Sequence, residues 1–246
     1  MHPIDLRSDT VTLPTNEMLE AISKAELGDD VFQEDPTVNK LEHLAAKTFN
    51  KESAIFMPSG TMANLVAVLT HCQRGDEVIL GDQSHTFLYE AGGISSFGGV
   101  HSRQIKNYDD GTMSLEDIKS SIRKKDVHFP TSRLVCLENT HNRCFGMPLD
   151  MNYINKVSEI VKNNSMMLHV DGARIFNAAT ALNKSVAELT SEVDSVSFCL
   201  SKGLSAPSGS LLCGKKEFIE KARFNRKALG GGMRQSGILA AAGIVA

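Results

Sequence analysis

The chain has 246 residues, of which 41% are hydrophobic and 22% charged, and its formal net charge is -3. This composition is typical of a globular protein, and the length allows one large α/β domain or two smaller ones. Charges of both signs are interspersed and no apolar run is long enough to span a bilayer. We therefore expect neither a nucleic acid nor a membrane as a partner.

The cysteines and histidines show no pattern typical of a metal site, and none is expected. The five cysteines are scattered and form no CxxC pair, and the eight histidines include no HExxH motif. An odd number of dispersed cysteines favours free thiols in a reducing compartment. Residues 1–10 also lack a signal or transit pattern, so we expect a cytoplasmic protein, with the mitochondrial matrix as the alternative.

The first 50 residues are predicted to form an arm and two helices. Residues 5–12 are polar without a helical period and are expected to be extended. A first helix is predicted from Pro14 to about Leu27, and a second from Pro36 to about Phe49. Residues 51–246 are then predicted to form one cofactor-binding domain.

Short apolar runs, most of them separated by amphipathic helices, make up residues 51–246. This alternation predicts an α/β fold with a mostly parallel seven-stranded sheet flanked by helices. A short turn with Pro and Gly precedes the last run, so that strand is expected to be antiparallel. The predicted strands cover residues 53–57, 76–80, 100–105, 133–137, 166–171, 195–200 and 210–213.

Two of these strands end in residues of opposite charge. Asp171 closes one, and Lys202 follows the other within Ser201-Lys202-Gly203. Parallel strands end at one edge of a sheet, where ligands bind in open α/β folds. Burial disfavours an ammonium ion, so a lysine there becomes a nucleophile. Pyridoxal phosphate, with its aldehyde and basic ring nitrogen, would use both groups. The alternative is a surface lysine and a helix-capping aspartate.

Polar residues follow other predicted strands as well. Gly60 and Thr61 lie between a strand and a helix, where free N–H groups and the helix dipole favour an anion. A plain capping turn is the alternative there. His85 follows the next strand and is suited to stacking on a pyridine ring, although an isolated loop histidine is often structural. His141 belongs to a polar cluster after the strand at 133–137.

Several segments together resemble the low-specificity L-threonine aldolases, a family of fold-type I pyridoxal phosphate enzymes with the aspartate-aminotransferase-like fold. They extend from Asp5 to the final residues. The resemblance implies the large domain of that fold, and it implies that a small carboxy-terminal domain of about a hundred residues is missing. The segments are DLRSDTVT, GDDVFQEDPT, PSGTMAN, GDEVILGDQSH, YEAGG, CLENTHN, HVDGARIFNA, DSVSFCLSKGL and RKALGGGMRQ.

The resemblance implies roles for the residues at the strand ends. Lys202 would bind the aldehyde of pyridoxal 5'-phosphate covalently, and Asp171 would pair with the ring nitrogen. His85 would stack on the ring. Small and hydroxyl-bearing residues would hold the phosphate, helped by an arginine across a subunit boundary. The implied cofactor-binding residues are Lys202, Gly60, Thr61, His85, Asp171, Arg174, Ser201 and Arg234.

The reaction that the resemblance implies is aldol cleavage of L-threonine or L-allo-threonine to glycine and acetaldehyde. The implied catalytic residues are Lys202, His85 and His141, and the two histidines are rival candidates for the base. Two alternatives stay open. One is another β-eliminating lyase or an aminotransferase that uses the same cofactor. The other is a catalytically impaired fragment that retains only the fold.

The resemblance also implies substrate contacts and a shared active site. Arg174 would bind the substrate carboxylate with Ser8 nearby. Lys227 and Arg234 would reach the active site of a neighbouring subunit, so a homodimer or homotetramer is expected. The chain departs from the family pattern at Phe32, where tyrosine is frequent. One hydroxyl of the active site is therefore expected to be missing.

Overall fold

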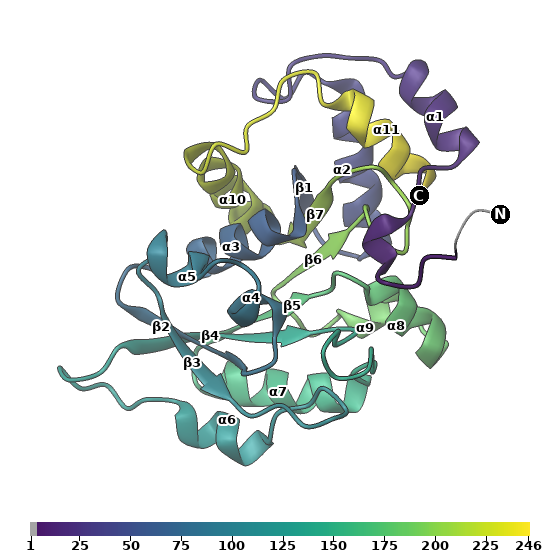
Figure 1. Ribbon diagram of the computed structural model, residues 1–246. Helices are drawn as coiled ribbons and strands as arrows, with labels where there is room; N and C mark the ends of the chain where they lie inside the picture. Colours follow the sequence, from purple (N-terminus) through teal and green to yellow (C-terminus); the bar gives the residue numbers. More distant parts are fainter. Residues whose placement is uncertain (1–3) are drawn as a thin grey trace.

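A single seven-stranded sheet forms the centre of the computed structural model, which describes residues 4–246 (Figure 1). The strand order is β1-β7-β6-β5-β4-β2-β3. The sequence-based strand predictions are confirmed, with small differences at the ends. The strands are β1 (Ser53–Met57), β2 (Asp76–Gly81), β3 (His101–Ile105), β4 (Thr131–Glu138), β5 (Met167–Asp171), β6 (Ser195–Cys199) and β7 (Ser210–Gly214).

Helices cover both faces of this sheet (Figure 1). The first element of the described chain is a 3-10 turn, η1 (Asp9–Val11). The α-helices are α1 (Asn16–Ser23), α2 (Pro36–Thr48), α3 (Gly60–His71), α4 (His85–Leu88), α5 (Gly93–Ser96), α6 (Leu115–Ser121), α7 (Met151–Asn163), α8 (Ile175–Leu182), α9 (Val186–Leu189), α10 (Lys216–Ala228) and α11 (Gly237–Val245).

The sheet is mixed, with one strand reversed. The strand β7 pairs antiparallel with both β1 and β6, whereas all other pairs are parallel. This arrangement confirms the predicted antiparallel last strand. In the register, Asp171 lies beside Glu138 on β4 and beside Ser197 on β6. The carboxyl ends of these strands are therefore level, and the loops that follow them gather at one edge.

The central strands are apolar because helices bury them on both sides. On one face, α2, α7 and α8 contribute side chains to the largest core cluster, among them Val38, Ile154 and Ala178. The helix α3 lies on the other face, where it contacts β1, β4, β5, β6 and β7. Because α3 begins directly after β1, its amino terminus lies at the edge where the loops gather.

The structure corrects three details of the predicted amino-terminal region and connections. The first helix ends at Ser23 rather than near Leu27, and the arm contains the turn η1, which Ser8 caps by accepting from Thr10 N. The helical connection between β5 and β6, which was expected to include residues 187–193, begins earlier, with α8 at Ile175. The division at residue 50 stays a prediction; α2 packs on β1 and β7 of the sheet.

Two further features bear on the expected environment of the protein. All five cysteines are free and buried, in line with the predicted free thiols. Among residues 4–246, none of the helices combines the length and the apolar character that crossing a membrane requires.

Candidate active site

A pocket of about 170 Å³ opens at the carboxyl ends of the strands. It collects six of the predicted site residues from loops that are far apart in the sequence. These six residues are Gly60, Thr61, His85, Asp171, Ser201 and Lys202. The remaining lining residues are Pro58, Ser59, Asn64, Glu90, Ala173 and Cys199. The expectation that strand ends would converge here is therefore met for these positions.

Asp171 ends β5 and is only 3% exposed. Its Oδ2 accepts a hydrogen bond from Nδ2 of Asn64 at 2.8 Å, and its Oδ1 accepts one from the backbone N–H of Ala173 at 3.1 Å. Neutral N–H donors of this kind stabilise a carboxylate anion without neutralising it. These two contacts fix the orientation of the carboxylate at the wall of the pocket.

The helix α3 brings an amino terminus to the wall of the pocket. Ser59 caps it, because its hydroxyl accepts from Met62 N. Gly60 follows in a confined place: a Cβ atom there would lie 2.7 Å from Sγ of Cys199. Only glycine lets the backbone come this close to β6. The N–H groups of Gly60 and Thr61, two residues that line the pocket, have no acceptor within the helix and favour an anion there.

Lys202 lies in the loop that follows β6, and its backbone is fixed on two sides. Its carbonyl oxygen accepts from Oγ1 of Thr12 at 2.8 Å and from the N–H of Ser205 at 2.8 Å. Cys199 also lines the pocket beside it. Burial raises the pKa of the Cys199 thiol, although Lys202 opposes the shift, so this neighbour stays neutral. The amine therefore has no anionic thiolate to bind.

His85 is paired with a buried carboxylate. Its Nδ1 lies 2.9 Å from Oε1 of Glu90, which is itself 5% exposed. A carboxylate accepts, so Nδ1 carries the proton and Nε2 is the free nitrogen of the neutral ring. The hydrogen bond to Glu90 raises the pKa of His85, whereas burial opposes the rise. Burial raises the pKa of Glu90.

Glu90 also joins His85 to Asp171. The same Oε1 accepts from Nδ2 of Asn64 at 2.8 Å, and that amide group is the one that donates to Asp171. One nitrogen of His85 and one carboxylate oxygen each of Glu90 and Asp171 lie within 4.8 Å of one another. The predicted ring-stacking histidine and the predicted ring-nitrogen partner thus share one hydrogen-bonded group.

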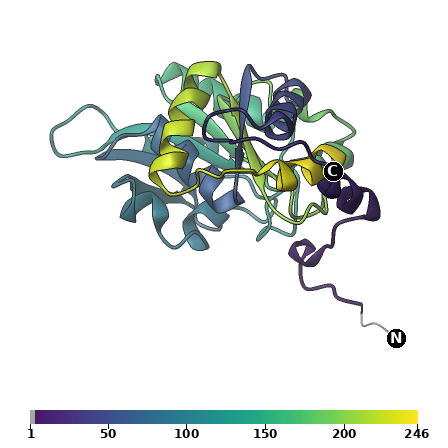
Figure 2. The ribbon, with the colours of Figure 1, turned by 90° about the horizontal axis from the view of Figure 1, so that it is seen from above.

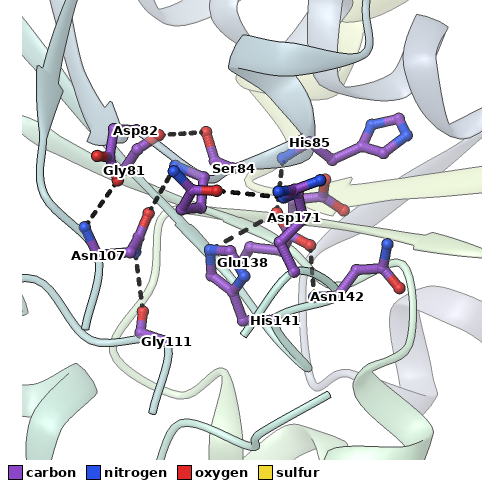
Figure 3. A network of polar contacts seen from close by, with 12 residues as sticks. Gly81, Asp82, Ser84, His85, Asn107, Gly111, Glu138, His141, Asn142 and Asp171 are labelled. Carbon is purple, nitrogen blue, oxygen red and sulfur yellow. Dashed lines mark hydrogen bonds and ion pairs between the residues drawn. The ribbon is translucent and has the colours of Figure 1, made fainter. Parts of the chain in front are cut away.

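His141 does not line this pocket. It is 1% exposed, and burial lowers its pKa. Within the described chain, neither ring nitrogen has a hydrogen-bond partner, and Nε2 lies 4.0 Å from Oε2 of Glu138. Glu138 itself accepts from the N–H groups of His85 and Asn142 (Figure 3). Burial, reinforced by the charge of Asp171, raises the pKa of Glu138 to about 7.

Arg174 lies just after β5 and binds a carboxylate of its own chain. Its Nε and Nη2 donate to Oδ2 and Oδ1 of Asp9 at 2.8 and 2.6 Å. This pair attaches the turn η1 to the segment between Asp171 and α8. Ser8, the cap of that turn, is adjacent to Asp9. Neither Arg174 nor Ser8 is among the residues that line the pocket.

Lys227 and Arg234 lie away from the pocket. Lys227 belongs to α10, and Arg234 follows that helix, where its Nη1 donates to Asp29 at 2.8 Å. The side chain of Arg234 is 57% exposed. Within one chain, the structure therefore does not bring these two residues to the other predicted site residues.

Comparison with known proteins identifies the chain. Its sequence matches the family described as beta-eliminating lyase over residues 5–246. The chain belongs to this family. Proteins of this family depend on pyridoxal phosphate.

Curated relatives of this lyase are similar over nearly its whole length. A probable low-specificity L-threonine aldolase of Arabidopsis thaliana is 54% identical over 246 residues, which are 99% of this chain and 69% of the relative. A low-specificity L-threonine aldolase of Escherichia coli is 51% identical over 243 residues, which are 99% of this chain and 72% of that protein. The lyase thus spans about 70% of the length of these relatives.

Solved structures share the fold. A threonine aldolase of Leishmania major superimposes with a TM-score of 0.85 at 21% identity, covering 99% of this chain and 72% of its own. At that identity the likeness concerns the fold alone. It confirms the predicted α/β architecture, a mostly parallel sheet flanked by helices.

Sequence reasoning missed several polar residues of this lyase site. Glu90 and Asn64 lie inside the segments YEAGG and PSGTMAN, but the sequence pattern assigns no role to either. Asp9 and Glu138 were missed as well. A signal existed for Asn64, because it is a polar residue at a position of α3 that faces the sheet. Its two carboxylate partners are distant in sequence, so their identity required the structure.

Proposed function

We propose that this lyase cleaves L-threonine and L-allo-threonine to glycine and acetaldehyde, with pyridoxal 5'-phosphate as its cofactor. The named activities of the curated relatives support this reaction. The observation that carries the proposal is that Lys202 and Asp171 line one pocket, next to the amino terminus of α3. An amine, a buried acid and an anion site in one pocket match the functional groups of the cofactor.

The residues of the pocket fit this cofactor. Gly60 and Thr61 would offer backbone N–H groups to the phosphate, and Ser201 would offer a hydroxyl. Asp171 would face the protonated ring nitrogen, and Lys202 would bind the aldehyde carbon. When bound, the cofactor accepts the electron pair that the breaking Cα–Cβ bond leaves on the substrate. The carboxylate of Asp171 would stabilise the positive ring nitrogen on which that capacity depends.

We assign the base to His85 rather than to His141. The Nδ1 proton of His85 is held by Glu90, so Nε2 is free to accept the proton of the substrate β-hydroxyl. The carboxylate also makes the ring more basic, in the manner of the acid that orients a catalytic histidine. His141 is fully enclosed and lies outside the pocket wall, so it has no direct path to a substrate oxygen.

Arg174 is proposed to bind the substrate carboxylate. Asp9 occupies its Nε and one hydrogen of Nη2, which leaves Nη1 and the second Nη2 hydrogen for a ligand. These two groups form a fork that matches the two oxygens of a carboxylate. Ser8, next to Asp9, is proposed to add its hydroxyl to the same contact.

A homodimer or homotetramer with shared active sites is proposed as the working assembly. The arm before η1 extends away from the sheet (Figure 2), and its apolar side chains Ile4 and Leu6 are 89% and 90% exposed. Phe32 is 69% exposed beside the loop that holds Arg234. Burial of these side chains against a second subunit would bring Lys227 and Arg234 toward its pocket. The free thiols support a location in the cytoplasm, with the mitochondrial matrix as the second candidate.

The test is an assay of the purified protein with added pyridoxal phosphate. We expect equal amounts of acetaldehyde and glycine from L-threonine, and a cofactor that borohydride fixes to the protein. Lys202→Ala should abolish the fixation, whereas Lys184→Ala, which changes an exposed lysine paired with Glu188, should retain it. Keto acid without acetaldehyde would indicate an aminotransferase. Failure of the wild-type protein to take up the cofactor would indicate a fragment that retains only the fold.

A further inference from the structure

A continuous series of hydrogen bonds runs between α3 and the sheet, away from the pocket and toward the opposite edge. It begins at Asn64, whose Oδ1 lies 3.3 Å from Nε2 of His169. The Nδ1 of His169 lies 2.8 Å from Oγ of Ser195, and the same Oγ lies 2.8 Å from Nε2 of His71. Of these four residues, only Asn64 lines the pocket.

The series follows from the spacing of the sequence. Asn64 and His71 are seven residues apart on α3, a spacing that places both on one face of the helix. His169 and Asp171 are two residues apart on β5 and therefore lie on the same face of the strand, and the register sets Ser195 beside His169. The helix face and the strand face therefore present one row of polar side chains to each other within an apolar core.

The direction of every bond in the row is fixed by the carboxylates at its end. Nδ2 of Asn64 donates to both Asp171 and Glu90, so Oδ1 of Asn64 is the acceptor. Ser197 therefore donates its hydroxyl proton to that oxygen at 2.7 Å, and Nε2 of His169 donates as well. His169 thus carries its proton on Nε2, and its Nδ1 is an acceptor.

The remaining two bonds follow from this tautomer. Because Nδ1 of His169 accepts, Ser195 donates its hydroxyl proton to it. The oxygen of Ser195 then accepts from His71, which must carry its proton on Nε2. Burial lowers the pKa of His169 to about 4 and that of His71 to about 3, so both rings are neutral at physiological pH. Each donor in the row points toward Asp171.

We propose that His71, Ser195 and His169 act through Asn64 as a positioning chain that holds the carboxylate of Asp171 oriented toward a cationic ring nitrogen in the pocket. Aligned neutral dipoles stabilise an anion, and a row of hydrogen bonds strengthens each member. A cationic side chain at the position of Asn64 would instead pair with Asp171 and weaken the attraction of Asp171 for the ring nitrogen. The role assigned to Asp171 rests on the proposed function; the direction of the hydrogen bonds does not.

The first test uses the wild-type protein without cofactor. Two-bond nitrogen–proton correlation spectra of the 15N-histidine-labelled protein report the tautomer and charge of each ring. We expect His169 and His71 to be neutral and protonated on Nε2 at pH 7. A proton on Nδ1 of His169, or a charged ring there, would reverse the direction of the row and overturn the proposal, whatever reaction the protein catalyses.

The second test cuts the row at successive distances from Asp171. His169→Leu removes both bonds of that ring, and we expect about tenfold weaker binding of pyridoxal phosphate and a similar loss in kcat, with KM for threonine little changed. His169→Gln places an amide near the position of Nε2, so it should recover part of the loss. Ser195→Ala should have a smaller effect than His169→Leu.

His71→Phe should have the smallest effect, because it cuts the outermost bond. The substituted ring would keep the stacking on Phe218, whose centroid lies 4.4 Å from that of His71. His128→Phe, in an exposed loop, is the matched control and should change neither cofactor affinity nor kcat. A purely structural role would lower the melting temperature of the variants while the cofactor affinity of the folded protein stayed at the wild-type value, and this result would refute the proposal.

The two hypotheses fail separately in these experiments. If the wild-type protein binds the cofactor and the variants show the predicted graded losses, but no acetaldehyde is released, the proposed reaction is contradicted and the positioning role of His71, Ser195 and His169 is supported. If the wild-type protein cleaves threonine and His169→Leu also binds the cofactor and turns over normally, the proposed reaction is supported and the positioning role is contradicted.

Discussion

Arg174 and Asp9 form a two-point ion pair, with Nε 2.8 Å from Oδ2 and Nη2 2.6 Å from Oδ1. Their side chains are only 16% and 24% exposed, so the pair is stronger than a typical surface salt bridge. It fixes the guanidinium on one edge while the other edge stays available. The amino-terminal arm is therefore part of the machinery that prepares the proposed substrate-binding arginine.

We predict that Asp9→Ala raises KM for L-threonine about tenfold and changes kcat less, because a mobile arginine must become ordered when it binds a carboxylate. Steady-state kinetics of acetaldehyde release measure this effect. Asp5→Ala is the control, since Asp5 pairs with Arg7 on the exposed part of the same arm. A fall in KM for Asp9→Ala would instead show that Asp9 competes with the substrate for Arg174.

We predict that Glu90→Gln moves the acidic limb of the kcat profile to lower pH. The hydrogen bond to Glu90 raises the pKa of His85, and Asp171 adds to the rise, while burial and Lys202 oppose it. A base must be neutral to act, so activity falls as the pH drops below this pKa. Glutamine still accepts through its oxygen but carries no charge. The pKa of His85 should then fall, and activity should persist to lower pH.

Asp126→Asn is the matched control for this pH experiment. It removes the charge beside His128, an exposed histidine whose Nδ1 lies 2.6 Å from Asp126, and should leave the profile unchanged. If Glu90→Gln also left the acidic limb in place, His85 would not be the group that titrates there. The assignment of the base would then return to His141 and its neighbour Glu138.

The part of the site that could be predicted from sequence is the part that strand ends determine. Lys202, Asp171 and His85 each follow an apolar run, and parallel strands bring such positions together without knowledge of side-chain packing. His141 also follows a strand, but the turn after β4 folds it inward. Its N–H donates to Met147 O at 3.0 Å, and it packs so closely on Gly111 that a Cβ atom there would lie 2.8 Å from its own Cβ.

The row behind Asp171 could not be predicted, because it depends on how a helix lies on a sheet. Asn64 and His169 are separated by 105 residues, and neither the helical nor the strand period reveals that their side chains meet. The same limit applies to Asp9 and Arg174, which are 165 residues apart. Local patterns predict which face a residue presents; they do not predict its partner on another element.

We predict that Asp35→Ala lowers the free energy of unfolding by about 3 kcal/mol, because it leaves buried N–H donors without an acceptor. Asp35 is fully buried at the start of α2 and accepts from Gly28, Thr37, Val38 and Gly237. Chemical denaturation measures the loss. Asp150→Ala, which removes the more exposed cap of α7, should cost about 1 kcal/mol. Equal losses of unfolding free energy in the two variants would contradict the larger contribution expected from the buried cap.

We predict that Gly60→Ala weakens pyridoxal phosphate binding about tenfold, because the new methyl group forces the start of α3 away from β6. The obstacle is Sγ of Cys199, which would lie 2.7 Å from the added methyl carbon. Adding Cys199→Ala to this variant should therefore restore most of the affinity. Fluorescence titration of the wild type, the two single variants and the double variant gives the coupling free energy between the two positions. Gly93→Ala, whose Cβ would have its nearest contact at 3.5 Å, should bind normally. Additive losses in the double variant would show that the N–H groups at Gly60, rather than the space beside Cys199, limit the binding.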